Sequence, residues 1–279
     1  MSNIKDKTVK GLFWSLIDSG LGQGLQFSIG IMLARILSPR EFGLIGMLTF
    51  FLVISQTIVN SGFTSALIRK SKCTQEDYST VFYFNVGGSI ILYAVLFFFS
   101  KTIASFYDEP IIELLIKVMG LSIIINAFSI VQRTILTKNI NFKLQTKISV
   151  IASIISGAIA IWMAKTGFGV WSLVGLALSR FFVRTVLLWI LMHWTPTLIF
   201  SKKSFNDLFS YGSKLLLSAL INTSFTNIYT LIIGKYFSVI HLGYYTRAKQ
   251  FTDLPSMNMN SIIGRVTFPV LSILHDDKI

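Results

Sequence analysis

Long apolar stretches recur along the whole chain, and short polar segments separate them. Each stretch is close to the roughly 20 residues that a helix needs to cross the hydrocarbon core of a bilayer. The pattern predicts an all-α, polytopic membrane protein with about eight transmembrane helices. They are expected at residues 12–34, 43–67, 79–100, 114–136, 148–164, 170–192, 211–233 and 243–272.

Composition strengthens the membrane prediction. Of the 279 residues, 53% are hydrophobic and only 13% are charged, against roughly 25% charged in an average soluble protein. A soluble chain of this length has too little interior to bury so much apolar surface. The net charge of +13 is not concentrated in an Arg/Lys-rich helix with base-stacking aromatics, so no nucleic-acid partner is expected. Cys73 is single and the three histidines are dispersed, which predicts neither a metal site nor a cofactor.

The cations in the polar segments predict the orientation of the chain. Most of them fall on the side of the N-terminus: Lys5, Lys7, Lys10, Arg69, Lys70, Lys72, Lys138, Lys143, Lys147, Lys202, Lys203 and Lys278. The opposite side holds Arg35, Arg40, Lys101, Lys165 and Lys235. Because cytoplasmic loops are enriched in Lys and Arg, the N-terminus is expected in the cytoplasm.

An internal repeat predicts the domain organisation. Residues 34–44 and 234–244 share small, basic and apolar positions, a Ser and a Gly in the same register, 200 residues apart. Six spans separate the copies, so both face the same way, as in the parallel repeats of transporters. We expect a six-helix lobe at 1–195, a cytoplasmic linker at 196–210 and the first two helices of a second lobe at 211–279. A second lobe of two helices would make the chain a truncated fragment that does not transport alone.

Polar side chains inside the spans are candidates for a transport cavity, because charge in the bilayer centre is costly. The candidate cationic contacts are Arg247, Arg265, Arg180, Arg133, Arg184 and Lys214. The candidate polar lining is Gln26, Asn126, Asn222 and Asn258, and Asp18 is a candidate for ion coupling. The excess of cations suits an anionic passenger, and a guanidinium fits phosphate well. For Arg133 and Arg184, near the expected inner face, snorkelling to the interface is an equal alternative.

Five segments together resemble Wzx-type lipopolysaccharide and capsular polysaccharide exporters, close to those that move colanic-acid units. They are Leu33–Gly43, Arg133–Lys143, Gly167–Val174, Leu242–Ala248 and Arg265–Ser272. The resemblance implies a flippase of the multidrug/oligosaccharidyl-lipid/polysaccharide exporter superfamily, with two six-helix lobes around a central cavity in the bacterial inner membrane. The implied passenger is an oligosaccharide repeat unit on undecaprenyl diphosphate. Membrane lipids, a polysaccharide polymerase and other assembly proteins are the further partners expected.

Two other functions fit the sequence less well. A cation-coupled multidrug exporter of the same superfamily would need buried carboxylates, and the spans offer only Asp18 and Asp253. A membrane enzyme such as a glycan polymerase would normally have a large outer loop, and no loop here is long enough to hold a catalytic site. The sequence therefore favours a transporter without enzymatic activity.

Overall fold

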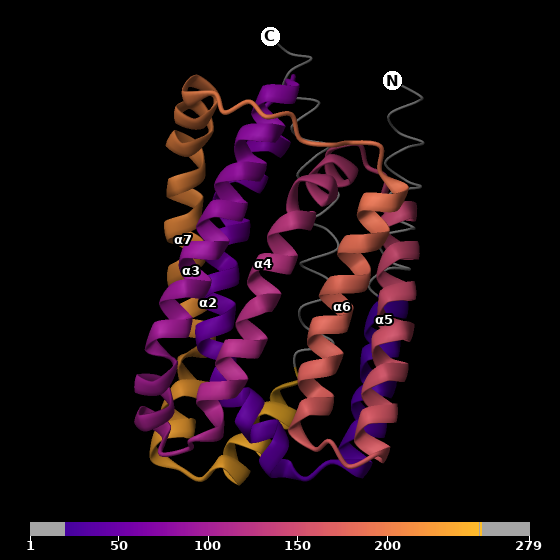
Figure 1. Cartoon of the computed structure of the whole chain (residues 1–279), viewed down its shortest axis with the longest axis vertical. Helices are drawn as coiled ribbons and strands as arrows, with labels where there is room; N and C mark the ends of the chain where they lie inside the picture. The colour runs from indigo at the N-terminus through magenta and orange to yellow at the C-terminus, as the bar shows by residue number, and fades with distance from the viewer. Residues whose placement is uncertain (1–19, 251, 253–279) are drawn as a thin grey trace.

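The computed structural model describes residues 20–250 and 252. Throughout this part of the chain the fold is helical, with no strand. Six helices are long and apolar enough to cross a membrane, and they run side by side along the long axis of the molecule (Figure 1). They are α2 (Pro39–Arg69), α3 (Gln75–Tyr107), α4 (Ile111–Lys138), α5 (Phe142–Lys165), α6 (Val170–Leu191) and α7 (Lys202–Tyr236).

Residues 20–36 and 239–250 are also helical, at the places of the first and eighth expected spans. Parts of those two spans lie outside the described residues. The all-α, membrane-spanning fold class expected from the sequence is confirmed. The protein is a multi-pass membrane protein.

The helices extend past the apolar runs because capping residues, not hydropathy, determine where they begin and end. α3 begins at a capping box formed by Thr74 and Asp77 and ends at Asp108, whose φ of 58° is left-handed. Its 33 residues span about 50 Å at 1.5 Å per residue, well beyond the hydrocarbon core. α2 likewise begins at a capping box of Ser38 and Glu41.

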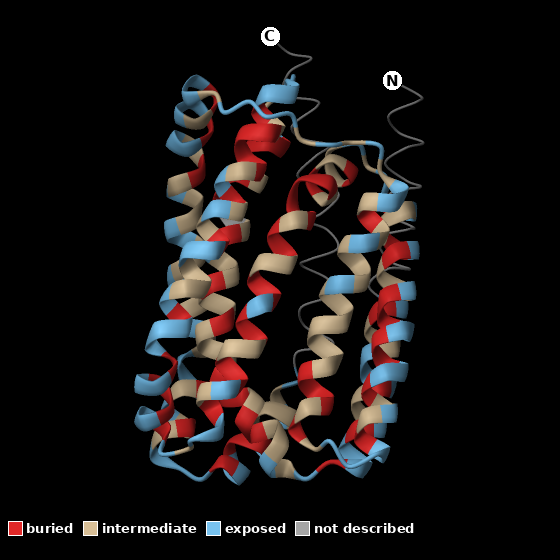
Figure 2. Cartoon of the chain, viewed as in Figure 1, coloured by how far each residue is buried: buried red, intermediate tan, exposed pale blue. Residues whose placement is uncertain are grey.

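α4 is the centre of the bundle and the most continuously buried helix (Figure 2). It packs against α2, α3, α5 and α6, while α7 packs along α2. The largest core cluster joins Leu115, Ile116 and Ile123 of α4 to Met47 and Leu48 of α2. Lipid tails are as apolar as these side chains, so close van der Waals packing and not the hydrophobic effect stabilises the cluster inside a bilayer.

The two ends of the bundle are named here by the ends of α2. At the Pro39 end, α2 and α6 begin and α3 turns into α4. At the Lys70 end, α2 ends and the connection from α6 to α7 crosses the bundle, drawn in orange at the top of Figure 1.

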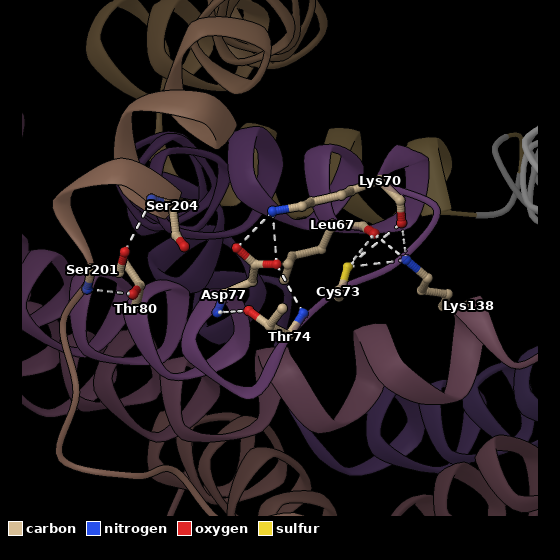
Figure 3. Close-up of polar contacts among 9 residues, drawn as sticks. All are labelled: Leu67, Lys70, Cys73, Thr74, Asp77, Thr80, Lys138, Ser201 and Ser204. Carbon is tan, nitrogen blue, oxygen red and sulfur yellow. Dashed lines mark hydrogen bonds and ion pairs between the residues drawn. The ribbon is translucent and has the colours of Figure 1, made fainter.

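A polar cluster holds the helix ends together at the Lys70 end (Figure 3). The Lys138 Nζ donates to the carbonyl oxygen of Leu67 at 2.9 Å and to that of Lys70, and lies 3.0 Å from the Cys73 Sγ. The buried Asp77 carboxylate accepts from the Lys70 Nζ at 2.8 Å and from the Thr74 amide at 2.9 Å. Lys138 thereby satisfies carbonyls at the C-terminus of α2 that have no partner within the helix.

The linker between α6 and α7 is fastened to the first turns of α3. The Ser201 amide donates to the Thr80 Oγ1 at 3.0 Å, the Thr197 amide donates to the Ser79 Oγ at 3.0 Å, and the Gln75 side chain bonds to Thr195. The linker expected at 196–210 is therefore only partly extended. From Lys202 onward it is helical, because Ser201 caps α7 and Leu208 is buried against α2.

The two copies of the sequence repeat have the same local structure. One helix ends at residue 36 and the next begins at 39, and likewise one ends at 236 and the next begins at 239. Ser38 caps the first of these starts, and the Ser238 Oγ accepts from the His241 amide at 3.3 Å in the second. The 200-residue offset is therefore present in the backbone as well as in the sequence.

We predict that Asp77→Ala will lower the stability of the helical bundle by about 2–3 kcal/mol, since it removes both a helix cap and a buried acceptor. Thermal unfolding of the purified protein in detergent measures this as a lower midpoint. The matched control is Glu113→Gln, which breaks a more exposed pair with Lys117 and should cost only about 0.3–0.5 kcal/mol. Equal midpoints for the two variants would contradict the role given to Asp77.

Candidate functional site

Two cavities in the bundle are each lined by two arginines. The first, which we call the Arg247 cavity, has a volume of about 290 Å³. Its walls come from the helix at 20–36, α2, α4, α6 and the helix at 239–250, and include Gln26, Phe42, Thr49, Arg180 and Arg247. The second, the Arg133 cavity, has a volume of about 350 Å³ and is lined from α2, α4, α5 and α6.

Arg247 is held firmly in its cavity. Its guanidinium carbon lies 3.3 Å from the centre of the Phe42 ring, a close cation–π contact. One terminal nitrogen donates to the Gly30 carbonyl at 3.2 Å, and the other donates to the Gln250 side chain at 2.9 Å. Arg247 therefore joins the helix at 239–250 to the helix at 20–36 and to the first turn of α2. Its charge is only partly balanced, because both acceptors are neutral.

Arg180 reaches the same cavity from α6. Within the described residues, no acceptor lies in hydrogen-bonding distance of its buried Nε, and the same holds for the Nε of Arg247. A buried nitrogen without an acceptor costs about 1–3 kcal/mol, and more when it is charged. The described part of the chain therefore leaves the Nε of Arg180 and the Nε of Arg247 buried and without a hydrogen-bond acceptor.

The Arg133 cavity is built on a chain of amides. The Asn126 Nδ2 donates to the Asn60 Oδ1 at 3.0 Å, and the same oxygen lies 3.5 Å from a terminal nitrogen of Arg133. The Asn126 Oδ1 lies 3.4 Å from a terminal nitrogen of Arg184. Asn126 is 2% exposed, so the network fixes both guanidinium groups from within the bundle.

The two cavities lie one after the other along α6. Arg180 and Arg184 are four residues apart, or about 6 Å along the helix axis, and each lines a different cavity. Neither cavity has an Asp or Glu among its lining residues. The described lining of both cavities therefore carries positive charge and no carboxylate.

The structure brings together some of the predicted site residues and not others. Gln26, Arg180 and Arg247 share one cavity, and Arg133 and Arg184 share the other, with Asn126 bound to Arg184. Lys214 and Asn222 lie exposed on α7 and line neither cavity. The remaining candidates lie outside the described residues: Asp18, Asn258 and Arg265.

Sequence reasoning missed the residues that orient the arginines. Asn60 sits in the second apolar run, at i, i+4 spacing from Gln56 and Thr64, and that spacing was the signal that could have found it. Phe42 belongs to the first repeat copy, and only its proximity to Arg247 in space reveals its role. Among the described residues, no three His, Cys, Asp or Glu side chains gather in a group that could hold a metal ion.

Together the fold and the cavities define a class: a multi-pass membrane protein whose helices line cation-rich cavities. The polysaccharide biosynthesis protein family matches residues 32–279, and the chain belongs to this family. The resemblance to Wzx-type exporters expected from the sequence is confirmed.

Named relatives come from several bacteria. The chain is 26% identical to the teichuronic acid biosynthesis protein TuaB of Bacillus subtilis, over 98% of this chain and 57% of that protein. It is 27% identical to the succinoglycan biosynthesis transport protein ExoT of Rhizobium meliloti, over 98% and 56%. It is 25% identical to the lipopolysaccharide biosynthesis protein WzxC of Escherichia coli, over 99% and 56%. The chain thus spans somewhat more than half the length of these relatives.

A solved structure shares the fold. The crystal structure of MATE in complex with MaD3S superposes with a TM-score of 0.56 at 17% identity, covering 95% of this chain and 66% of that chain. At this identity the likeness concerns the fold alone.

We predict that Asn126→Ala will destabilise the bundle by about 1–3 kcal/mol, because it removes a buried amide that donates to Asn60 and accepts from Arg184. The control is Asn222→Ala on the exposed face of α7, which should change stability by at most about 0.5 kcal/mol. Chemical or thermal unfolding in detergent separates the two. If Asn126→Ala behaves like the control, the amide network does not hold the arginines.

Proposed function

We propose that the protein is a Wzx-type flippase, which moves an oligosaccharide repeat unit on undecaprenyl diphosphate across the bacterial inner membrane for lipopolysaccharide, O-antigen or capsule synthesis. It acts as a transporter and not as an enzyme. The observation that carries the proposal is the convergence of Arg180 and Arg247 on one cavity without a lining carboxylate. The names of two relatives, a transport protein for succinoglycan and a lipopolysaccharide biosynthesis protein, support it.

The chemistry of the passenger fits the two cavities. A diphosphate carries its charge on oxygens that guanidinium groups bind through paired hydrogen bonds. The long hydrocarbon tail gains nothing from leaving the lipid, so only the head group has to cross. A head group that leaves the Arg133 cavity would meet the Arg180 and Arg247 donors about one helical turn away along α6. Arg265, which lies outside the described residues, is a further proposed contact.

The proposed topology places the Lys70 end in the cytoplasm together with the N-terminus. Basic side chains gather at this end, including Lys70, Lys138, Lys202 and Lys203, as the enrichment of cations in cytoplasmic loops predicts. In this orientation the Arg133 cavity lies on the side where lipid-linked repeat units are made. We propose residues 1–195 as one lobe and 211–279 as the start of a second, with Asp18 as a coupling residue.

The alternative, a cation-coupled drug exporter, finds no support in the cavities. A cationic drug or a coupling ion needs a carboxylate, and none lines either cavity in the described part of the chain. Expression in a host without its own drug pumps should therefore confer no resistance.

We predict that Arg180→Ala and Arg247→Ala will each reduce export of the repeat unit by roughly tenfold or more, the usual effect of losing a charged hydrogen bond. The variants are made in the 279-residue chain and in the longest reading frame that contains it, in a host lacking its own exporter. Surface polysaccharide and accumulated lipid-linked repeat units are measured together. Arg247→Lys should be intermediate, because it keeps the charge without the planar fork.

The control for charge alone is Arg35→Ala, an exposed arginine that lines neither cavity. It should export at the parental level. Normal surface polysaccharide from the variant lacking both Arg180 and Arg247 would refute the assignment of these residues.

A further inference from the structure

At the Pro39 end, α2 and the helix at 239–250 contact each other through two glycines, one from each helix. A Cβ on Gly43 would overlap the carbonyl oxygen of Val239, and a Cβ on Gly243 would overlap that of Pro39. Gly43 and Gly243 are 200 residues apart, and so are Pro39 and Val239. Each helix start therefore rests on the glycine of its repeat partner, about a local two-fold axis. The indigo and yellow segments at the bottom of Figure 1 are these two starts. We call this the Pro39-end contact.

A second glycine pair brings α2 and α7 together toward the other end. A Cβ on Gly62 of α2 would lie 2.8 Å from the carbonyl oxygen of Gly212 of α7, and a Cβ on Gly212 would lie 2.8 Å from that of Gly62. We call this the Lys70-end contact. Between the two contacts, α2 and α7 are joined by a hydrogen bond of 3.3 Å between the hydroxyls of Thr57 and Thr223.

Both contacts require glycine because backbone lies against backbone. A side-chain neighbour can rotate away from an added methyl, whereas a carbonyl fixed in a helix cannot. A Cβ on Gly46 or Gly157 would meet side-chain atoms, and Gly87 and Gly88 of α3 meet nothing within 4 Å. Among the described glycines, close approach to backbone is thus a property of these two contacts.

Each contact lies beside one of the two cavities. Phe42 and Gly46, on either side of Gly43 in the chain, line the Arg247 cavity. Thr64, two residues beyond Gly62 and therefore on the opposite side of α2, lines the Arg133 cavity. An ion pair between Lys235 and Asp108, 3.2 Å long, adds to the Pro39-end contact.

We propose that these two glycine contacts are the positions at which the lobes close the opposite ends of the transport path, and that a Cβ at either one favours opening of that end alone. The proposal rests on the transport function proposed above, because a static membrane protein has no need of two separable closures. The glycines act as positioning residues, since they set how closely the lobes approach and do not bind the passenger.

The test measures access to each cavity from each side of the membrane. Cysteine probes are placed at Thr49→Cys in the Arg247 cavity and at Thr64→Cys in the Arg133 cavity, in a Cys73→Ser background that removes the single native thiol. A membrane-impermeant maleimide is applied to intact cells and to inverted membrane vesicles. Labelling rates are normalised to the amount of inserted protein.

Alanine at the Pro39-end contact should raise labelling of the Thr49→Cys probe in intact cells, with no gain in vesicles. Alanine at the Lys70-end contact should raise labelling of the Thr64→Cys probe in vesicles only. The expected rise is about fivefold or more, which corresponds to an ordinary overpacking cost. The four substitutions are Gly43→Ala, Gly243→Ala, Gly62→Ala and Gly212→Ala.

Gly87→Ala and Gly88→Ala are the matched controls, and both should label at the parental rate. Equal changes on both sides, or none, in all four contact variants would overturn the proposal, because a purely structural glycine alters stability without sidedness. If the Pro39-end variants gain labelling only in vesicles and the Lys70-end variants only in intact cells, the role of the contacts is supported and the proposed orientation in the membrane is reversed. Side-specific labelling in a protein that exports no polysaccharide would support the proposed role of the glycine contacts and refute the proposed flippase function.

One variant avoids the risk that alanine prevents folding. Lys235→Ala removes the exposed ion pair with Asp108 without adding an atom to the interface. Since such pairs contribute little, labelling of the Thr49→Cys probe in intact cells should rise by a factor of about two to five. An unchanged rate in this variant would show that the Pro39 end does not open there.

Discussion

The cost of placing a guanidinium in hydrocarbon constrains most of this structure. On insertion scales the cost is roughly 2.5–3.5 kcal/mol at the centre of a membrane helix, and it falls only if protein groups surround the charge. Arg247 meets that demand with the Phe42 ring and the Gly30 carbonyl, and Arg133 and Arg184 meet it with the Asn60–Asn126 amides. Because all these partners are neutral, the positive charge remains and two cavities form around it.

The need to surround Arg247 with protein groups also links the Arg247 cavity to the distance between α2 and the helix at 239–250. Arg247 lies on the helix that follows Gly243, and its partners lie on the helix at 20–36 and in the first turn of α2. A change in the distance between the two helix starts would therefore move Arg247 relative to Arg180, which α6 holds in place. The proposed closure at this end and the proposed binding of an anion therefore depend on the same contacts.

Much of the fold could be predicted from hydropathy, because the bilayer requires long apolar helices. The repeat was also visible, since Ser38 and Ser238 begin helices in the same way. Helix ends could not be placed, because caps such as Thr74 and Ser201 lie outside the apolar runs. The site was predicted only in part. Helical spacing placed Arg180 one turn from Arg184, but it could not show that they line different cavities. Helical spacing also could not show that Lys214, on a polar stripe of α7, lies exposed. The side of α7 that packs against α2 carries Gly212, and spacing alone does not tell which side of a helix faces its neighbour.

The Arg247 cavity is proposed to bind a diphosphate, and a direct binding measurement tests this most simply. Inorganic pyrophosphate is titrated into the purified 279-residue protein in detergent, and heat is recorded by isothermal calorimetry at several salt concentrations. We expect saturable binding that weakens with salt, is weaker for inorganic monophosphate, and falls at least roughly tenfold when Arg247 is replaced by alanine. Pyrophosphate binding of unchanged affinity in the variant lacking both Arg180 and Arg247 would contradict this proposal.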